Sequence, residues 1–264
     1  MKKIHTFVVL AYKESKDLER CIKSVLNQKY KSEVVIATAT PNKYISSLAK
    51  KYKLEVIVNE NHIDIGGDFD FAISVGKTDL VTVAHQDDVY DYEYSYEMVE
   101  AYKKNKDALI LFPNYYEIKN NNNVYDNLNL KIKRFLLRPL LNQSKSSKKS
   151  RKQKVLKYGC AIGCPSVTFN TKKVSLPVFF GSGMKCNIDW FGWERLSRQD
   201  GKFIYIPKYL MGHTISEETT TTEIINAGIR TKEDLFMLKK FWPTPIAIII
   251  NKIYKNAEKN NKTN

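Results

Sequence analysis

The chain has 264 residues and a mass of 30.6 kDa, which is enough for one large domain with a substantial hydrophobic core. Lys and Arg outnumber Asp and Glu by 15, and the excess lies in two basic segments. Residues 131–157 hold eleven basic and no acidic side chains, and residues 239–264 hold six basic and one acidic. The rest is close to neutral and shows no zinc-finger or RNA-binding pattern, which argues against a nucleic-acid partner. The basic segments fit an anionic membrane surface, although a solubilising charge run remains equally open.

The sequence also argues against a membrane span, a signal peptide and a disulfide framework. The apolar runs at residues 7–11 and 246–250 are five residues long, too short for a span or a signal-peptide core. The four cysteines show no paired CxxC spacing, which favours reduced thiols over bridges or a zinc site. We therefore expect a cytoplasmic protein whose basic segments contact the inner face of the membrane.

The first 112 residues alternate between apolar β-branched runs and amphipathic stripes. The predicted elements are strands at residues 4–11, 33–38, 54–58, 79–84 and 108–112, and helices at residues 16–28, 42–52, 68–76 and 92–104. Several strands are apolar throughout, which indicates an α/β fold: a Rossmann-like, mostly parallel sheet with helices on both faces. Ligands of such sheets bind at the carboxyl ends of the strands, here the loops after Leu10, Ile36, Val58 and Val83.

The second half is less regular. Its predicted features, in chain order, are a surface turn at 120–123, a mobile stretch at 145–154, a strand-like run at 158–170, a helix at 187–198, a short strand at 203–206, a flexible loop at 216–222, and helices at 231–241 and 246–257. Pro243 and Pro245 separate the last two helices, which form a C-terminal helical extension.

The sharpest local pattern is His85-Gln86-Asp87-Asp88, directly after the fourth predicted strand. Adjacent carboxylates at the end of a strand repel each other unless a cation neutralises them. Their oxygen ligands suit Mg²⁺ or Mn²⁺, which in turn binds a diphosphate. An Asp-rich turn that caps the following helix explains the pattern equally well.

Three further patterns carry possible chemistry. Gly66 and Gly67 allow close approach of a ligand to the backbone, although a Gly-Gly turn with an Asp cap is the more common explanation. Asp189 is flanked by large apolar side chains, which raise a carboxylate pKa and suit a general base; an N-cap on an amphipathic helix with core tryptophans is the competing explanation. His213 precedes a polar loop at 216–222 that could close over a site.

Taken together, these features and their order resemble a family 2 glycosyltransferase with the GT-A fold, from about Phe7 to about Pro245. The similar segments are the opening Val8-Val9-Leu10-Ala11-Tyr12-Lys13-Glu14, the run Ser24-Val25-Leu26-Asn27-Gln28, Asn61 with Gly66-Gly67, the acidic pattern at His85 to Asp88, the run Cys164-Pro165-Ser166-Val167-Thr168, and Asp189-Trp190 with Trp193-Glu194-Arg195-Leu196. The run that starts at Cys164 is similar to bacterial surface-polysaccharide transferases.

Three positions depart from the family pattern. His85 stands at the first position of the DxD motif, so Asp87 is the expected metal ligand and Asp88 its helper. The second strand ends in Ala37-Thr38-Ala39-Thr40 instead of acidic residues, so contact with the nucleobase is expected from Thr38 and Glu14. Ile188-Asp189 replaces a Glu-Asp pair and keeps the aspartate.

The resemblance implies an inverting, metal-dependent transfer from a nucleotide-diphospho-sugar, in the first instance a UDP-sugar. The acceptor is a hydroxyl of a glycan or lipid-linked molecule in bacterial surface polysaccharide synthesis. The cofactor is Mn²⁺ or Mg²⁺, and residues 1–112 form the nucleotide-sugar half, 113–215 the acceptor half, and 216–264 a flexible loop with the C-terminal helices. By role, the implied residues are Asp189 as catalytic base; Asp87, Asp88 and His213 for the metal; Trp190 and Trp193 for the acceptor; and Ala11, Tyr12, Glu14, Thr38, Asn61, Gly67, Asp68, His85, Gln86 and Asp87 for the nucleotide-sugar.

Two alternatives stay open. The substitutions at His85 and Thr38 are compatible with a non-catalytic nucleotide-sugar-binding member of the same fold. A nucleotidyltransferase shares the α/β, metal-diphosphate architecture, but it needs a Gly-, Arg- and Lys-rich phosphate loop after the first strand. Residues 11–15 are not such a loop.

Overall fold

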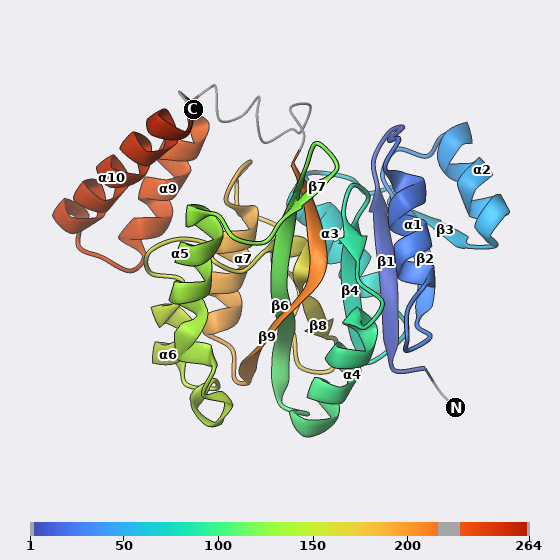
Figure 1. The fold of residues 1–264 in the computed structure, drawn as a ribbon, viewed down its shortest axis with the longest axis horizontal. Coiled ribbons are helices and arrows are strands. Elements are labelled where there is room, and N and C mark those ends of the chain that lie inside the picture. Colours follow the sequence, from blue (N-terminus) through green and yellow to red (C-terminus); the bar gives the residue numbers. More distant parts are fainter. Residues whose placement is uncertain (1–2, 216–227, 263–264) are drawn as a thin grey trace.

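One sheet runs through the part of the chain that the computed structural model describes, residues 3–215 and 228–262 (Figure 1). Its strand order is β3-β2-β1-β4-β8-β6-β9-β5, and β7 pairs with the C-terminal end of β6. The strands are β1 (His5–Ala11), β2 (Glu33–Thr38), β3 (Glu55–Val58), β4 (Leu80–His85), β5 (Val89–Tyr90), β6 (Ala108–Lys119), β7 (Asn122–Val124), β8 (Thr168–Asn170) and β9 (Lys202–Ile215).

The apolar strands send alternate side chains into two separate cores. In β1, Phe7 and Val9 pack in one core, and Val8 packs in the other. The core around Phe7 is closed by α1 (Leu18–Leu26), α2 (Lys43–Tyr52) and α4 (Tyr94–Lys104). The core around Val8 is closed by α3 (Ile65–Val75), α7 (Ile188–Ser197), α9 (Ile229–Lys239) and α10 (Thr244–Lys262). The predicted α/β fold with helices on both faces of the sheet is therefore confirmed.

The four parallel strands of the first half end at one edge of the sheet. Ala11 is paired with Thr38, Thr38 with Val58, and Leu10 with His85. The loops that follow these strands therefore start side by side, as expected for a ligand site in such a sheet.

Two strands are longer than their apolar runs predict. β6 and β9 lie parallel and stay paired from Ala108 beside Lys202 to Lys119 beside Ile215. Buried polar side chains such as Asn114 interrupt the apolar pattern of β6, which is why the prediction stopped at residue 112. β6 therefore runs straight through the boundary expected between residues 112 and 113. The turn expected at residues 120–123 is shorter than predicted: Asn120 and Asn121, with φ angles of 48° and 62°, form it between β6 and β7, and residues 122–123 belong to β7.

Two predictions for the second half were wrong. Of the strand-like run at 158–170, only β8 is a strand, and a short 3₁₀ turn at Cys164–Ser166 precedes it. The stretch expected to be mobile contains α6 (Lys149–Lys154), and it follows α5 (Leu128–Leu137) and a 3₁₀ turn (Arg138–Leu140). The Lys152 side chain is 1% exposed, and its ammonium group donates to the carbonyls of Gln199 and Gly201. These carbonyls satisfy a charged group that the sequence pattern placed in solvent.

The C-terminal extension is a pair of helices, α9 and α10, as predicted. Pro243 lies between them, at the break that the sequence indicates. The flexible loop predicted at residues 216–222 lies outside the described residues. None of the helices in the described ranges has the length and apolar character to cross a membrane.

Candidate active site

The acidic pattern after β4 folds into a tight cluster. One possible ligand atom from each of His85, Asp87 and Asp88 lies within 4.8 Å of the others. The Asp88 side chain is fully buried; its Oδ1 accepts hydrogen bonds from Nδ1–H of His213 (3.0 Å) and from the backbone N–H of Thr214 (2.8 Å). Its Oδ2 and the Nε2 of His85 are buried without a hydrogen-bond partner in the structure. Such unsatisfied buried atoms are unusual and fit a site that binds a ligand.

The charges of the cluster also fit a cation. Burial and the neighbouring Asp88 raise the pKa of Asp87 to about 6, and burial lowers the pKa of His85 to about 4. Burial alone would lower the pKa of His213, but the charge and hydrogen bond of Asp88 outweigh it and raise that pKa. Two carboxylates beside a neutral imidazole form a donor set that suits Mn²⁺ or Mg²⁺. Asp87, Asp88 and His85 therefore fit a divalent ion, whereas His213 reaches the cluster through Asp88.

Gln86 joins the cluster to the loop after β1. Its Oε1 accepts from the backbone N–H of Tyr12 (2.9 Å), and its Nε2 donates to the Tyr12 carbonyl (3.0 Å). Lys13, with a φ of 53°, donates its N–H to Thr40 in the loop after β2. These bonds hold the loops after β1, β2 and β4 against one another, which explains how residues far apart in sequence share one site.

The other residues expected to bind the nucleotide-sugar differ in exposure. Tyr12 and Glu14 are exposed, whereas Ala11 is buried at the end of β1. Thr38 is 0% exposed, and its hydroxyl accepts from the N–H of Thr40. The side chain thus serves the turn after its own strand, and its contact with the nucleobase stays a prediction that this burial does not favour.

The Gly-Gly segment begins a helix earlier than predicted. α3 starts at Ile65 instead of Asp68, because Oδ1 of Asp64 accepts from the N–H of Gly67 (2.6 Å). A side chain at Gly66 would meet the carbonyl oxygen of Phe179 at 2.8 Å, so this glycine permits close packing of backbone on backbone.

Asp68 holds the same loop rather than pointing outward. Its carboxylate accepts from Nδ2 of Asn59 (2.8 Å) and pairs with His62 (2.9 Å). The expected ligand Asn61 is exposed, and its backbone N–H bonds Oδ1 of Asn59. Asp68 thus shapes the loop, and Asn61 and Gly67 remain predicted contacts of the nucleotide-sugar.

Asp189 is the second residue of α7 and lies in an unusual setting for a carboxylate. Oδ2 accepts from the thiol of Cys160 (3.2 Å), and Oδ1 accepts from the N–H of Trp190 (2.7 Å). Burial raises the pKa of Asp189, although these two hydrogen bonds and the charges of Lys133 and Arg230 act to lower it. A carboxylate with a raised pKa is suited to accept a proton.

The two tryptophans beside it do not line a sugar site. Trp190 and Trp193 are 1% and 0% exposed. Their indole N–H groups donate to the carbonyls of Leu156 (2.9 Å) and Ile162 (3.3 Å). The expectation that they stack on an acceptor was wrong: they belong to the core beneath α7, as the amphipathic-helix interpretation requires.

Side chains that the sequence analysis missed connect Asp189 to the acidic cluster. Lys133 in α5 donates to the hydroxyl of Tyr115 (2.6 Å), and the Tyr115 ring meets His213 edge-on at 6.0 Å. The buried thiol of Cys164 is affected by both Asp189 and Asp88, which raise its pKa together with burial. The base candidate and the acidic cluster are therefore both close enough to Cys164 to affect its thiol.

Arg20 in α1 was missed as well. Its guanidinium donates to the carbonyl of Asp87 (2.9 Å) and to the hydroxyl of Thr214 (2.9 Å), and it pairs with Asp17 (3.1 Å). The sequence did carry a signal for Arg20. Only seven of the 43 basic residues are Arg, and a planar guanidinium is favoured where one side chain must bind several acceptors.

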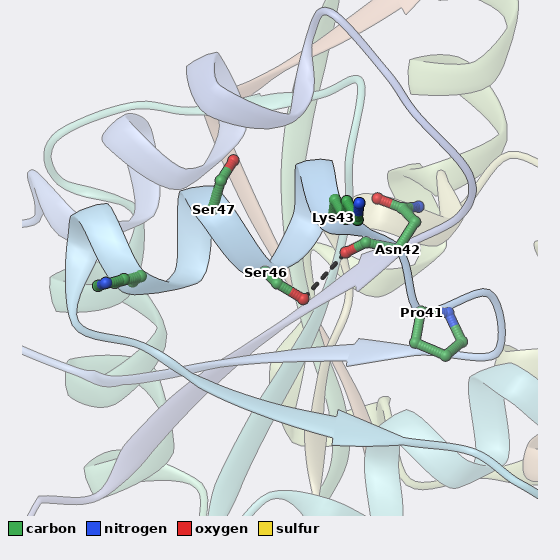
Figure 2. A pocket seen from close by; sticks show the side chains of 6 residues that line it. Pro41, Asn42, Lys43, Ser46 and Ser47 are labelled. Carbon is green, nitrogen blue, oxygen red and sulfur yellow. Dashed lines mark hydrogen bonds between the residues drawn. The ribbon is translucent and has the colours of Figure 1, made fainter.

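A hollow over α2 lies apart from this constellation (Figure 2). Figure 2 shows the Ser46 hydroxyl directed at the Asn42 carbonyl, a bond of 2.9 Å within the helix. The hollow is open to solvent, and it is lined by Pro41, Asn42, Lys43, Ser46, Ser47 and Lys50. It brings together no acid, base or metal ligand.

The chain is similar to known proteins in both sequence and fold. The model of Glycosyl transferase family 2 matches residues 6–175, which is more than half of the chain. No match is found among curated proteins.

Among solved structures, that of residues 1–349 of S. aureus TarS has a TM-score of 0.60 at 12% identity and covers 94% of this chain and 69% of that one. The same fragment in complex with UDP-GlcNAc has a TM-score of 0.60 at 15% identity over 90% of this chain and 71% of that one. The longer TarS structure is matched over 42% of its length. At these identities the likeness concerns the fold, and it agrees with a GT-A architecture. With the sequence match over residues 6–175, the chain belongs to glycosyl transferase family 2.

Proposed function

We propose that the protein transfers a sugar from a nucleotide-diphospho-sugar to a hydroxyl group of a glycan or lipid-linked acceptor, with inversion at the anomeric carbon. The observation that carries this proposal is the cluster of Asp87 and the buried Asp88 at the sheet edge, where one oxygen of Asp88 has no hydrogen-bond partner, together with the carboxylate of Asp189, whose pKa burial raises. The similar fold of TarS in complex with UDP-GlcNAc supports a UDP-sugar as donor.

The donor is proposed to lie along the loops that Gln86 holds together. Tyr12, Glu14 and Asn61 are exposed there and free to contact the nucleotide. Mn²⁺ or Mg²⁺ held by Asp87 and Asp88, with His85 beside them, would neutralise the charge of the leaving nucleoside diphosphate. Residues 1–112 then supply the donor contacts, and residues 113–215 supply those to the acceptor. His213 fixes the orientation of Asp88 and remains a proposed ligand.

Asp189 is proposed to take the proton from the attacking acceptor hydroxyl. Its carboxylate is held by Cys160 and by the backbone of Trp190, so one orientation is favoured before the acceptor arrives. Preorganisation of this kind contributes much of the rate acceleration in group transfer. Attack from the face opposite the leaving diphosphate gives inversion.

The acceptor is proposed to belong to bacterial surface polysaccharide synthesis, on the cytoplasmic face of the membrane. The charge of residues 131–157, eleven basic and no acidic side chains, supports a contact between this segment and anionic lipid.

Hydrolysis of UDP-GlcNAc in the presence of Mn²⁺ is the direct test, because slow transfer to water requires no known acceptor. We expect turnover by the native chain, loss of turnover in Asp189→Asn and Asp87→Asn, and full turnover in Asp107→Asn, an exposed aspartate paired with Lys202. Full activity of Asp189→Asn would remove that residue from its role. UDP-GlcNAc binding without turnover across donors and acceptors would favour the non-catalytic alternative.

A further inference from the structure

Helix α5 carries apolar side chains on two opposite faces. Its inward face holds Leu130 and Leu137, which are 2% and 4% exposed. Leu128, Ile132 and Phe135 follow one another at intervals of four and three residues and are 74%, 49% and 63% exposed. At 100° per residue these three side chains form one stripe, directly opposite the buried leucines. We call Leu128, Ile132 and Phe135 the outer stripe of α5.

Basic side chains border the outer stripe. Lys131 and Arg138 lie on the same flank of the helix by their position, and the Arg138 guanidinium stands 5.2 Å from the centre of the Phe135 ring. From Lys131 to Lys157, through α5 and α6, the chain has no acidic residue. An apolar stripe beside cationic side chains is the arrangement of helices that lie in the surface of an anionic bilayer.

The inner side of the same helix belongs to the proposed acceptor half. Lys133 contacts Tyr115, which in turn contacts His213 beside Asp88. α5 lies beyond β6 from β1, β2 and β3, so the outer stripe is far from the donor loops (Figure 1). A bilayer on this helix would leave the nucleotide loops open to solvent and bring the acceptor half close to lipid.

We propose that α5 lies in the interface of an anionic lipid bilayer, with Leu128, Ile132 and Phe135 inserted between the lipids. The positive charge beside the stripe favours an anionic bilayer over a second copy of the chain as the partner of α5. Asp126, just before α5, pairs with Lys131 (3.1 Å) and Arg134 (2.5 Å), but α5 and α6 themselves hold no acidic residue, so a two-fold contact through the outer stripe would bring an excess of positive charge together. The inference rests on the membrane contact proposed above, but its experiment is independent of sugar transfer.

The test is sedimentation of the full chain with phosphatidylcholine vesicles, with or without roughly 30% phosphatidylglycerol. We expect binding to the anionic vesicles alone and weaker binding in high salt. The triple variant Leu128→Ser, Ile132→Ser, Phe135→Ser should bind about tenfold or more weakly, because each insertion contributes apolar burial. Its melting temperature should stay within a few degrees of the native value, since the stripe is exposed.

A matched control removes an equal number of exposed side chains from α10. Ile246, Ile249 and Ile253 are 42%, 59% and 61% exposed and are also changed to Ser. α10 lies in the second basic segment, residues 239–264, so this variant separates the two segments: if α5 carries the contact, the α10 variant should keep vesicle binding. An equal loss in both triple variants, absence of vesicle binding by the native chain, or a native dimer that only the α5 variant dissociates would each overturn the proposal.

UDP-GlcNAc hydrolysis, measured without vesicles, should be unchanged in the α5 variant. If the native chain shows no hydrolysis, the proposed activity fails while the binding assay still decides the role of α5.

Discussion

A carboxylate that is to act as a base must lie among apolar neighbours and still be ionised. Asp189 lies among such neighbours: burial raises its pKa, while Cys160, Trp190 and the charge of Lys133 favour the ionised form. The cluster of Asp87 and Asp88 also contains polar atoms in an unfavourable setting, because Oδ2 of Asp88 and Nε2 of His85 are buried without a hydrogen-bond partner in the structure. Buried carboxylates and unpartnered polar atoms of this kind reduce the stability of the fold, as expected where side chains are placed for a function rather than for stability.

The raised pKa of Asp189 leads to a prediction about stability. The native state binds this proton more tightly than the unfolded chain, so the free energy of unfolding decreases as pH rises from the unfolded pKa through the native one. Above the unfolded pKa, Asp189 is therefore destabilising relative to a side chain that carries no charge. Asp189→Asn should raise the melting temperature at pH 7 while lowering sugar transfer by about a hundredfold or more. At pH 3, where both states carry the proton, the stability advantage should vanish; a variant less stable than native at pH 7 would contradict this.

A second prediction about stability and pH concerns His5, a histidine in the core. His5 is fully buried between Ser32 (2.7 Å) and Thr82 (2.8 Å), and burial lowers its pKa to about 3. The unfolded chain binds a proton near pH 6.5, so stability is present above that pH and is lost as pH falls toward 3. We expect a loss of about 2 kcal/mol between pH 8 and pH 5 from this residue.

Urea denaturation at several pH values measures the effect. His5→Gln should flatten the dependence, because its amide can bond both hydroxyls but does not titrate. An unaltered slope in the His5 variant would assign acid sensitivity to other groups.

At the scale of elements, the start of α7 depends on a different helix. Glu233 in α9 accepts hydrogen bonds from the backbone N–H groups of Lys185 (2.7 Å), Cys186 (2.8 Å) and Asn187 (2.9 Å). These groups lie directly before α7, whose second residue is Asp189. α9 therefore sets the position of the proposed base without touching it.

Replacement of Glu233 tests this coupling. Glu233→Ala leaves three N–H groups without their acceptor, so we expect a stability loss of about 1–3 kcal/mol and a lower kcat with little change in the KM for the donor. Glu233→Gln keeps one acceptor oxygen, so it should recover part of the stability and part of the kcat. Lys232→Ala, at an exposed neighbouring position, serves as the control. A change in donor KM without a change in kcat would place Glu233 in nucleotide binding instead.

The elements also show what sequence could reveal. Local periodicity is a property of neighbouring residues, so the strands and helices of the first half and the acidic cluster after β4 were predictable. Contacts between distant segments leave no such trace. The pairing of Gln86 with Tyr12, the carbonyls that receive Lys152 and the burial of Trp190 all depend on residues 30 or more positions away. These are the places where the predictions were silent or wrong.

For the whole molecule, a ligand that binds the native state alone stabilises every part of the fold. Mn²⁺ with UDP at about a hundred times the dissociation constant should add about 2.7 kcal/mol, or roughly 5–10 °C in melting temperature for a chain of this size. Thermal denaturation measures the shift, and EDTA should reverse the Mn²⁺-dependent part. Asp87→Asn should abolish that part and Asp107→Asn should keep it. An equal shift with and without Mn²⁺ would speak against the metal site.

The family match ends at residue 175, but the sheet does not. β9 comes from beyond that point and is the parallel neighbour of β6 and the partner of β5. A truncated protein that stops after the matched region would keep nearly all the recognisable sequence, yet it would lack Asp189 and leave one side of β6 bare. Unpaired strands of this length recruit other chains, so we expect insoluble aggregates from such a fragment rather than a minimal transferase.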